Sequence, residues 1–139
     1  MLNVCVEDIM SEQPIKVKEN VLVGSVAHLL LRYRINGILV VKEKNEHELV
    51  GVLTTTDLLR LIDIALSKRL HRMKALKKIA HLTAGQVASR NVMSLQKGDK
   101  IIKAVVLMHR KNIHTIPIYH KKKLVGVLGK HDILNMALI

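Results

Sequence analysis

The sequence predicts a mixed α/β (α+β) fold in which two β-α-β-β-α repeats pack sheet against sheet with pseudo-twofold symmetry. Three observations support this prediction: an internal repeat, an alternation of strand and helix patterns within each copy, and an almost purely aliphatic composition. The chain has 139 residues, of which 49% are hydrophobic, with two Tyr and neither Trp nor Phe. This is enough apolar material for a core, so a fully disordered chain is excluded.

The internal repeat covers most of the chain. Ile9-Met10-Ser11 aligns with Val87-Ala88-Ser89, and further along Leu49–Leu53 aligns with Leu124–Leu128. Both copies contain the block Leu-Val-Gly-Val-Leu with an Asp six residues after the Gly. Chance gives isolated apolar matches far more easily than an ordered block that occurs twice, so we interpret the halves as structural repeats.

Each element of the first copy follows from its residue pattern. A short extended segment runs from Pro14 to Val17, and two strands, Gly37–Val41 and Glu48–Leu53, flank a charged turn. A closing helix begins at Thr56-Asp57, where either residue can cap the first turn. Between the extended segment and the first strand, helical spacing predicts an amphipathic helix whose apolar face holds Val23, Val26, Ala27, Leu30 and Leu31.

The second copy repeats this order. Its extended segment runs from Val92 to Leu95, its strands are Thr115–Tyr119 and Lys123–Leu128, and its closing helix begins at His131-Asp132. The apolar face of its first helix consists of Ile101, Ala104, Val105 and Met108. A unit of this size buries little surface alone, and we therefore expect the two copies to pack together.

The segment between the copies predicts one long helix over residues 57–82, because no Pro or Gly interrupts it. Its apolar stripe is Leu59, Ile62, Leu66, Leu70, Met73, Leu76 and Ile79 or Ala80, and its basic face is Lys68, Arg69, Arg72, Lys74, Lys77 and Lys78. We therefore divide the chain into a first copy (1–60), a basic linker helix (61–83) and a second copy (84–139).

The charge is strongly positive and unevenly distributed. The chain has 23 Lys and Arg against 11 Asp and Glu, a net charge of +12; residues 60–139 have a net charge of +14 and residues 1–59 of −2. Such a surface suits polyanionic partners: nucleic acid, an acidic membrane surface or phosphorylated small molecules. A merely solvated basic face is the alternative interpretation of the linker charges. The near absence of aromatic residues disfavours stacking of single-stranded bases.

Several classes of protein are disfavoured by what the sequence lacks. The longest apolar stretch, Val21 to Leu31, is too short to span a bilayer, and the N-terminus has acidic residues where a secretion signal has basic ones. The single Cys5 excludes an intramolecular disulfide and fits a reducing compartment, so we expect a cytoplasmic protein without a membrane partner. The scattered His residues predict no metal site, and no catalytic set is apparent, so we expect no enzyme.

The repeated blocks resemble a known family. GVLTTTDLL at 51–59 and GVLGKHDIL at 126–134 are similar to the closing signature of the CBS domain, and VEDIMSEQPIKV at 6–17 resembles its opening. The resemblance covers essentially the whole chain as two tandem CBS motifs, a Bateman module. It implies a regulatory sensor that binds AMP, ADP, ATP or S-adenosylmethionine in clefts between the motifs, often as a homodimer, with no other cofactor.

The residues Thr54, Thr56 and Asp57 form the leading candidate site. They lie between a strand and a helix start, where amide groups and the helix dipole favour phosphate. Thr hydroxyls are potential donors to phosphate, and a carboxylate accepts hydrogen bonds from ribose hydroxyls. Helix capping is the alternative role for Asp57, and both roles are compatible.

The resemblance implies the partners of that site. Gly51–Asp57 is similar to the corresponding stretch in the gamma-subunit family of AMP-activated protein kinase. Carried over by position, one cleft holds Val52, Thr54, Thr56 and Asp57 with Val92, Met93, His114 and Thr115. Val92 and Met93 would flank adenine and His114 would approach phosphate, although a strand-edge His is the alternative. Thr115 stands where that family has Arg.

A second and weaker cleft is implied by the same resemblance. It consists of Asp132, His131 and Lys130 with Pro14, Ile15, Asn36 and Gly37. Gly129 replaces the Thr or Ser of the signature and removes a hydroxyl donor. We therefore expect this cleft to favour a nucleoside over a nucleotide.

Taken together, the sequence predicts a regulatory module that senses an adenosine-containing ligand by a conformational change, with a homodimer and a regulated protein as further partners. The alternative is a basic module that binds nucleic acid or protein without a small ligand.

Overall fold

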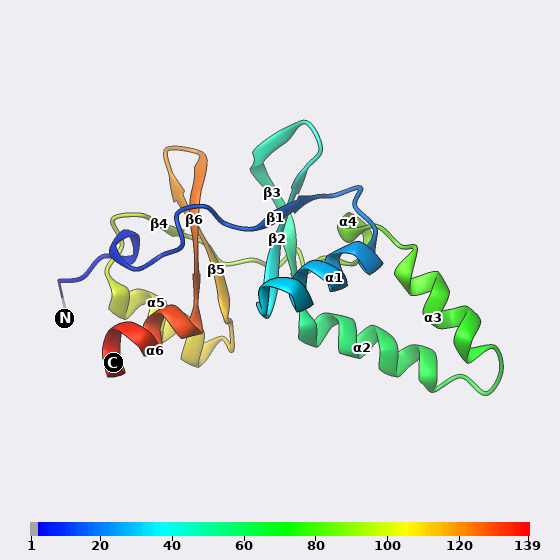
Figure 1. Ribbon diagram of the computed structural model, residues 1–139. Coiled ribbons are helices and arrows are strands. Elements are labelled where there is room, and N and C mark those ends of the chain that lie inside the picture. Colours follow the sequence, from blue (N-terminus) through cyan, green and yellow to red (C-terminus); the bar gives the residue numbers. More distant parts are fainter. Residues whose placement is uncertain (1–2) are drawn as a thin grey trace. The chain divides into compact units, whose positions relative to one another are not determined.

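The computed structural model describes residues 3–139, which form two compact units (Figure 1). One unit consists of the chain up to Ile15 together with Val92–Ile139, and the other of Lys16–Asn91. We call them the C-terminal unit and the central unit. The elements in chain order are η1 (Val6–Asp8), β1 (Lys16–Lys18), α1 (Val23–Tyr33), β2 (Gly37–Lys42), β3 (Asn45–Thr54), α2 (Thr55–Leu66), α3 (Arg72–Ala80), α4 (Ala84–Val87), β4 (Leu95–Gln96), α5 (Ile101–Arg110), β5 (Thr115–His120), β6 (Lys123–Gly129) and α6 (Lys130–Leu138).

Each unit contains a three-stranded sheet of the same topology. In the central unit β1 pairs parallel with β2, and β2 pairs antiparallel with β3. In the C-terminal unit β4, β5 and β6 repeat this arrangement. The order β-α-β-β-α therefore occurs twice, and the predicted mixed α+β fold is confirmed. The two opening strands begin later than predicted, at Lys16 and Leu95.

The opening segment of each repeat packs on the sheet of the other repeat. Met10 and Ser11 belong to the first copy by sequence, but Ser11 forms a bridge with Val127 of β6. Reciprocally, Ser89 of the second copy bridges Val52 of β3. Figure 1 shows the blue N-terminal segment among the orange and red elements of the C-terminal unit. The compact units and the sequence repeats therefore have different boundaries.

The central glycine of the repeated Leu-Val-Gly-Val-Leu block makes this pairing possible. A Cβ atom added to Gly51 would lie 2.3 Å from the carbonyl oxygen of Ser89, and one added to Gly126 would lie 2.8 Å from that of Ser11. Any side chain would push the opening segment off the sheet edge, because such distances are far below van der Waals contact. The repeated glycine is thus explained by close approach of a backbone.

The cores are aliphatic, as the composition predicts. The C-terminal unit buries Val6, Leu95, Ile101, Ala104, Met108, Ile116, Ile118 and Leu128 in one cluster. In the central unit β2 is the most deeply buried strand, since Ile38, Leu39, Val40 and Val41 are all at most 1% exposed. Two predictions for the helix faces are wrong, because Leu31 is 78% exposed and Val105 39% exposed. Each lies one position beyond the narrow stripe that faces its sheet.

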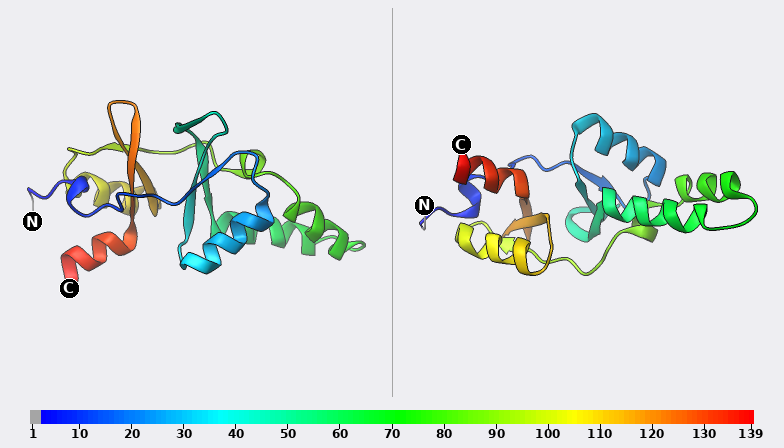
Figure 2. Two further views of the ribbon diagram at one scale, coloured as in Figure 1. Left: turned by 45° about the horizontal axis from the view of Figure 1, so that its top comes forward. Right: turned by 90° about the horizontal axis from the view of Figure 1, so that it is seen from below.

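The predicted single helix over residues 57–82 is also wrong. α2 ends at Leu66, α3 begins at Arg72, and His71 adopts a left-handed conformation with φ of 61°. The result is a helical hairpin in which α3 packs against α2 and α1, and Figures 1 and 2 show α3 folded back alongside α2. Tertiary packing reverses the chain here although no Pro or Gly marks the turn. Most of the predicted apolar stripe is consequently exposed: Leu59, Ile62, Leu66, Leu70 and Met73.

None of the helices formed by residues 3–139 is both long enough and apolar enough to cross a membrane.

Candidate ligand-binding site

The start of α2 is built around a reciprocal cap. Thr54 is the N-cap residue, and its hydroxyl oxygen accepts a hydrogen bond from the Asp57 amide at 3.2 Å. Asp57 Oδ2 accepts from the Thr54 amide and from the Thr54 hydroxyl, both at 2.9 Å. This is a capping box, so the capping role that the sequence left open for Asp57 is present in the structure.

The cap leaves one carboxylate oxygen of Asp57 outside the box. Oδ1 lies 3.5 Å from the Arg60 guanidinium, and the Asp57 side chain is 19% exposed while that of Arg60 is 68% exposed. An ion pair so open to solvent contributes little to stability. The carboxylate is therefore held rigidly by Oδ2 and remains able to accept a hydrogen bond through Oδ1.

The amide groups at this helix start are largely occupied. Thr55 donates its amide to the carbonyl of Asn36 at 2.8 Å, while the amides of Thr54 and Asp57 bond within the cap. Three of the four N–H groups that a helix start leaves unpaired thus have partners. The Thr54 hydroxyl is engaged as well, so the exposed Thr56 hydroxyl and the Arg60 guanidinium are the groups best suited to meet an anion.

The start of α6 repeats this arrangement in simpler form. Asp132 Oδ2 accepts from the Gly129 amide at 2.8 Å, but Gly129 has no hydroxyl to complete the cap. The position equivalent to Arg60 is Asn135, so this copy also lacks the neighbouring cation. Lys130 and His131 are exposed beside the half-buried Asp132.

Each unit brings a helix start together with the beginning of a neighbouring strand. Gly37 is paired with Thr54 across β2 and β3, and Thr115 is paired with Gly129 across β5 and β6. Thus Asn36 and Gly37 of the second predicted cleft adjoin Thr54 and Asp57 of the first. In the C-terminal unit, Thr115 of the first cleft similarly adjoins residues of the second.

The remaining predicted site residues differ in accessibility. Val52 is 6% exposed and forms two backbone hydrogen bonds with Ser89, so it belongs to the core of the central unit. Met93 and His114 are exposed, whereas Val92, Thr115, Pro14 and Ile15 are half-buried. The two clefts each combine residues of both units, and their assembly stays a prediction.

Sequence reasoning missed two features of this region. Arg60 was not considered, although a cation three residues after Asp57 on a helix is within reach of its carboxylate. The binding of Thr55 to Asn36 was not foreseen either, because it depends on the register of two strands. Among residues 3–139, no group of three His, Cys, Asp or Glu is placed to hold a metal ion.

Comparison with known proteins identifies the class. The family model described as the CBS domain matches residues 6–64 and 84–138, which is most of the chain. The chain therefore belongs to the CBS domain family, and its two motifs make it a CBS domain pair.

Particular relatives add detail. The chain is 25% identical over 132 residues to L-aspartate semialdehyde sulfurtransferase of Methanocaldococcus jannaschii, covering 94% of this chain and 23% of that protein. Across the curated relatives it spans between 23% and 64% of their length.

Two solved structures share the fold over nearly their whole length. The CBS domain pair of protein MJ0100 in complex with 5′-methylthioadenosine and S-adenosyl-L-methionine is 25% identical, with a TM-score of 0.73 and coverage of 96% of this chain and 94% of that one. The structure of CBSX2 in complex with AMP is 23% identical, with a TM-score of 0.76 and coverage of 96% of both chains.

Proposed function

We propose that this CBS domain pair is a regulatory module that binds an adenosine-containing ligand, with Asp57 accepting hydrogen bonds from the ribose hydroxyls. The observation that carries the proposal is the Thr54–Asp57 cap, which fixes a carboxylate at a helix start and leaves Oδ1 outside the cap. The relative of 25% identity crystallised with 5′-methylthioadenosine and S-adenosyl-L-methionine supports this class of ligand.

The ligand would be shared by the two motifs. We propose that Asp57 and Thr56 of the first motif bind the sugar and phosphate, while Val92 and Met93 of the second motif flank the purine. A ligand held by both motifs shifts their relative arrangement only to the extent that it binds one arrangement more tightly than another. This differential affinity is the proposed mechanism of sensing.

The first motif is better equipped for phosphate than the second. Arg60 adds a cation beside Asp57, and Thr56 adds an exposed hydroxyl, whereas the second motif has Asn135 at the position of Arg60. A lost hydrogen bond to a charged group costs about 1.5–3 kcal/mol, or roughly tenfold to a hundredfold in affinity. We therefore propose nucleotide preference at Asp57 and nucleoside preference at Asp132.

Isothermal titration calorimetry with AMP, ADP, ATP and S-adenosylmethionine tests the proposal. Asp57→Ala alone is ambiguous because it also removes a cap, which costs about 1 kcal/mol of stability. Thr56→Val leaves every hydrogen bond of the cap in place, so it is expected to weaken nucleotide binding about tenfold without lowering Tm. Thr83→Ala, which removes the capping hydroxyl at the start of α4 outside both proposed sites, is the control for loss of a helix cap. Unchanged binding in both Asp57→Ala and Thr56→Val would reject the site.

We further propose that the chain forms a cytoplasmic homodimer, is not itself an enzyme and regulates another protein. Large apolar side chains are exposed on α2, α5 and α6, among them Leu59, Ile102 and Leu134. Surfaces of this kind are typical of protein interfaces. Sedimentation equilibrium is expected to give twice the chain mass of 15.7 kDa, and a monomer at all concentrations would contradict the dimer.

A further inference from the structure

In the α2–α3 hairpin, α3 and the turn that joins it to α2 lie outside the two segments that the CBS family model matches. The family matches stop at residue 64 and resume at residue 84. The 19 residues between them contain six Lys and Arg and no Asp or Glu, which is half of the net charge of the chain. The features of this segment therefore need an explanation other than the ligand site.

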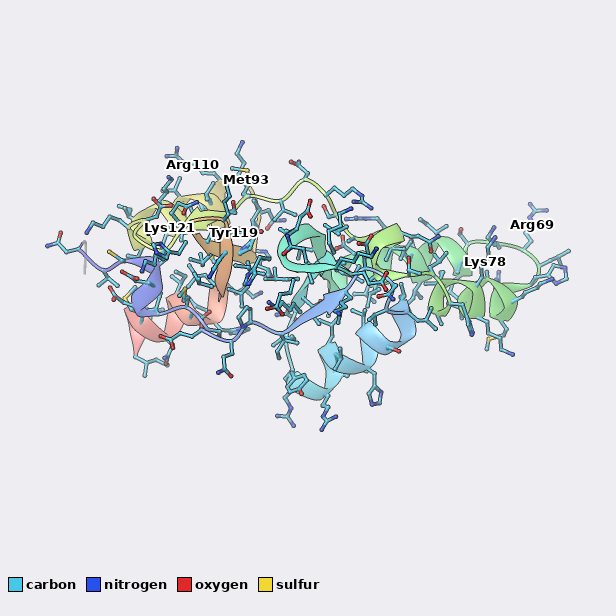
Figure 3. All side chains as sticks on the ribbon, turned by 90° about the horizontal axis from the view of Figure 1, so that it is seen from above. Arg69, Lys78, Met93, Arg110, Tyr119 and Lys121 are labelled. Carbon is cyan, nitrogen blue, oxygen red and sulfur yellow. The ribbon has the colours of Figure 1, made fainter. Side chains whose placement is uncertain are left out.

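The outer end of the hairpin is exposed along its whole length. Every residue from Leu66 to Lys74 is exposed, and we call this segment the hairpin tip. It holds four cations and three large apolar side chains, of which Leu70 is 72% exposed and Met73 is 68% exposed. Figure 3 shows Arg69 at this end of the hairpin, extending away from both helices. Cationic and apolar groups are thus presented together.

The six cations of residues 65–83 have no acidic partner among residues 3–139. The ion pairs formed within residues 3–139 involve Lys16, His47, Arg60, Lys97 and Lys103, all outside residues 65–83. Within the tip, Arg72 Nε donates a hydrogen bond to the carbonyl oxygen of Lys68 at 2.7 Å. Six uncompensated charges remain available to an anionic partner.

The apolar side chains decide which kind of anionic partner fits. The inner face of α3, from Ala75 to Ala80, packs against α1 and α2, so the helix itself has no free apolar face. Leu66, Leu70 and Met73 at the tip are free, and a lipid interface gives such side chains an apolar medium while its headgroups attract the cations. The phosphate backbone of a nucleic acid offers no apolar medium for these side chains. The hairpin also has no Phe, Tyr or Trp ring on which bases could stack.

We propose that the hairpin tip docks on an anionic phospholipid surface, with Leu70 and Met73 entering the interface and the surrounding cations contacting headgroups. This inference departs from the expectation of no membrane partner. That expectation rested on the lack of an apolar stretch long enough to span a bilayer, which does not bear on a contact at the membrane surface. The chain reversal at residues 67–71 exposes Leu70 and Met73 for such a contact. A second copy of the tip is disfavoured as the occupant because the two would repel each other.

Vesicle sedimentation with the full chain tests the proposal without any nucleotide. Binding is compared between phosphatidylcholine vesicles and vesicles in which phosphatidylglycerol replaces about one third of that lipid. We expect binding only to the second kind, weakening as salt screens the charges. Equal binding to both kinds, or to neither, would overturn the proposal.

Two pairs of variants separate the contributions. Lys68→Gln with Arg69→Gln is expected to lower the vesicle partition coefficient roughly 30-fold, because each Lys or Arg near an anionic surface adds about one factor of five. Leu70→Ser with Met73→Ser is expected to lower it at least about tenfold. The matched controls are Lys121→Gln with Lys122→Gln, and Leu31→Ser, which replaces an equally exposed leucine on α1.

The outcomes are distinguishable. If the tip variants and the controls lose vesicle binding equally, binding depends on the overall charge or hydrophobicity of the chain and not on the hairpin tip. That result would overturn the proposal. A fluorescence-anisotropy titration with duplex DNA tests the alternative that the hairpin binds nucleic acid. If the duplex binds more tightly than the vesicles and Leu70→Ser with Met73→Ser leaves that binding unchanged, the hairpin is a nucleic-acid surface and the lipid proposal is wrong.

Discussion

At the scale of single residues, the two repeated glycines and the two repeated aspartates have different physical tasks. Gly51 and Gly126 admit the backbone of an opening segment at the sheet edge. Asp57 and Asp132 each accept the amide at the start of their helix. The family signature therefore combines a glycine that the fold requires with a carboxylate that caps a helix.

Gly51→Ala is expected to destabilise the chain by about 2–3 kcal/mol, because overpacking forces the backbone of Ser89 away. It would break the two hydrogen bonds between Val52 and Ser89. Denaturant unfolding followed by circular dichroism measures the change. Gly98→Ala is the control, since an added Cβ there meets nothing within 4 Å, and its effect is expected to stay within about 0.5 kcal/mol. Equal effects of the two substitutions would contradict the close-approach explanation.

The roles of the site residues were predictable to different extents. Asp57 was identified because carboxylates at helix starts follow a local rule, and its capping alternative proved to be present. Arg60 and the Thr55–Asn36 hydrogen bond were not identified, because they depend on strand register and side-chain direction. Whether Asp57 meets Val92 and Met93 is still a prediction from family resemblance.

At the scale of elements, strands and short helices followed local patterns, and the interruption between α2 and α3 did not. Alternation and turn residues located β2, β3, β5 and β6 to within a few residues. The reversal at residues 67–71 has no turn signal, and His71 takes a left-handed conformation there. The packing of α3 on α1 and α2 imposes this reversal. The hydrophobic periodicity of the sequence is the same for one long helix and for two packed helices, so it cannot reveal the reversal.

Substitutions in the β5–β6 turn are predicted to stabilise the chain. Lys121 and Lys122 both have positive φ, of 50° and 62°, as in a type I′ turn, for which Asn-Gly is favoured. Lys121→Asn with Lys122→Gly is expected to raise the free energy of unfolding by about 1–2 kcal/mol, because left-handed residues without Asn or Gly are strained. Thermal unfolding measures it.

The equivalent turn in the first copy is the control. Glu43 and Lys44 occupy the two turn positions between paired Lys42 and Asn45, and neither has positive φ. Glu43→Asn with Lys44→Gly is therefore expected to give no gain in Tm. A gain of the same size in both turns would contradict the argument from backbone conformation.

At the scale of the whole molecule, the exchange of opening segments ties the two repeats together. Val6 belongs to the first repeat by sequence, yet it is 0% exposed in the core of the C-terminal unit. Sequence alignment of the copies could not reveal this exchange, because the pairing of Ser11 with Val127 joins segments more than one hundred residues apart.

Val6→Ala is therefore expected to destabilise the unit of the second repeat, by about 2 kcal/mol, through loss of buried methyl groups. Native-state hydrogen exchange is expected to accelerate in β5, β6 and α5. Val26→Ala, which removes an equally buried side chain from α1, is expected to accelerate exchange in β2 and β3 instead. If Val6→Ala instead accelerates hydrogen exchange mainly in β2 and β3, the compact units would coincide with the sequence repeats. That result would contradict the swapped opening segments.

The central claim is that both motifs hold one adenosine-containing ligand, and a crystal structure with AMP or S-adenosylmethionine in excess tests it most directly. The account predicts ribose hydroxyls within hydrogen-bond distance of the Asp57 carboxylate and the purine against Val92 and Met93. A ligand bound elsewhere, with Asp57 serving only its cap on Thr54, would contradict it.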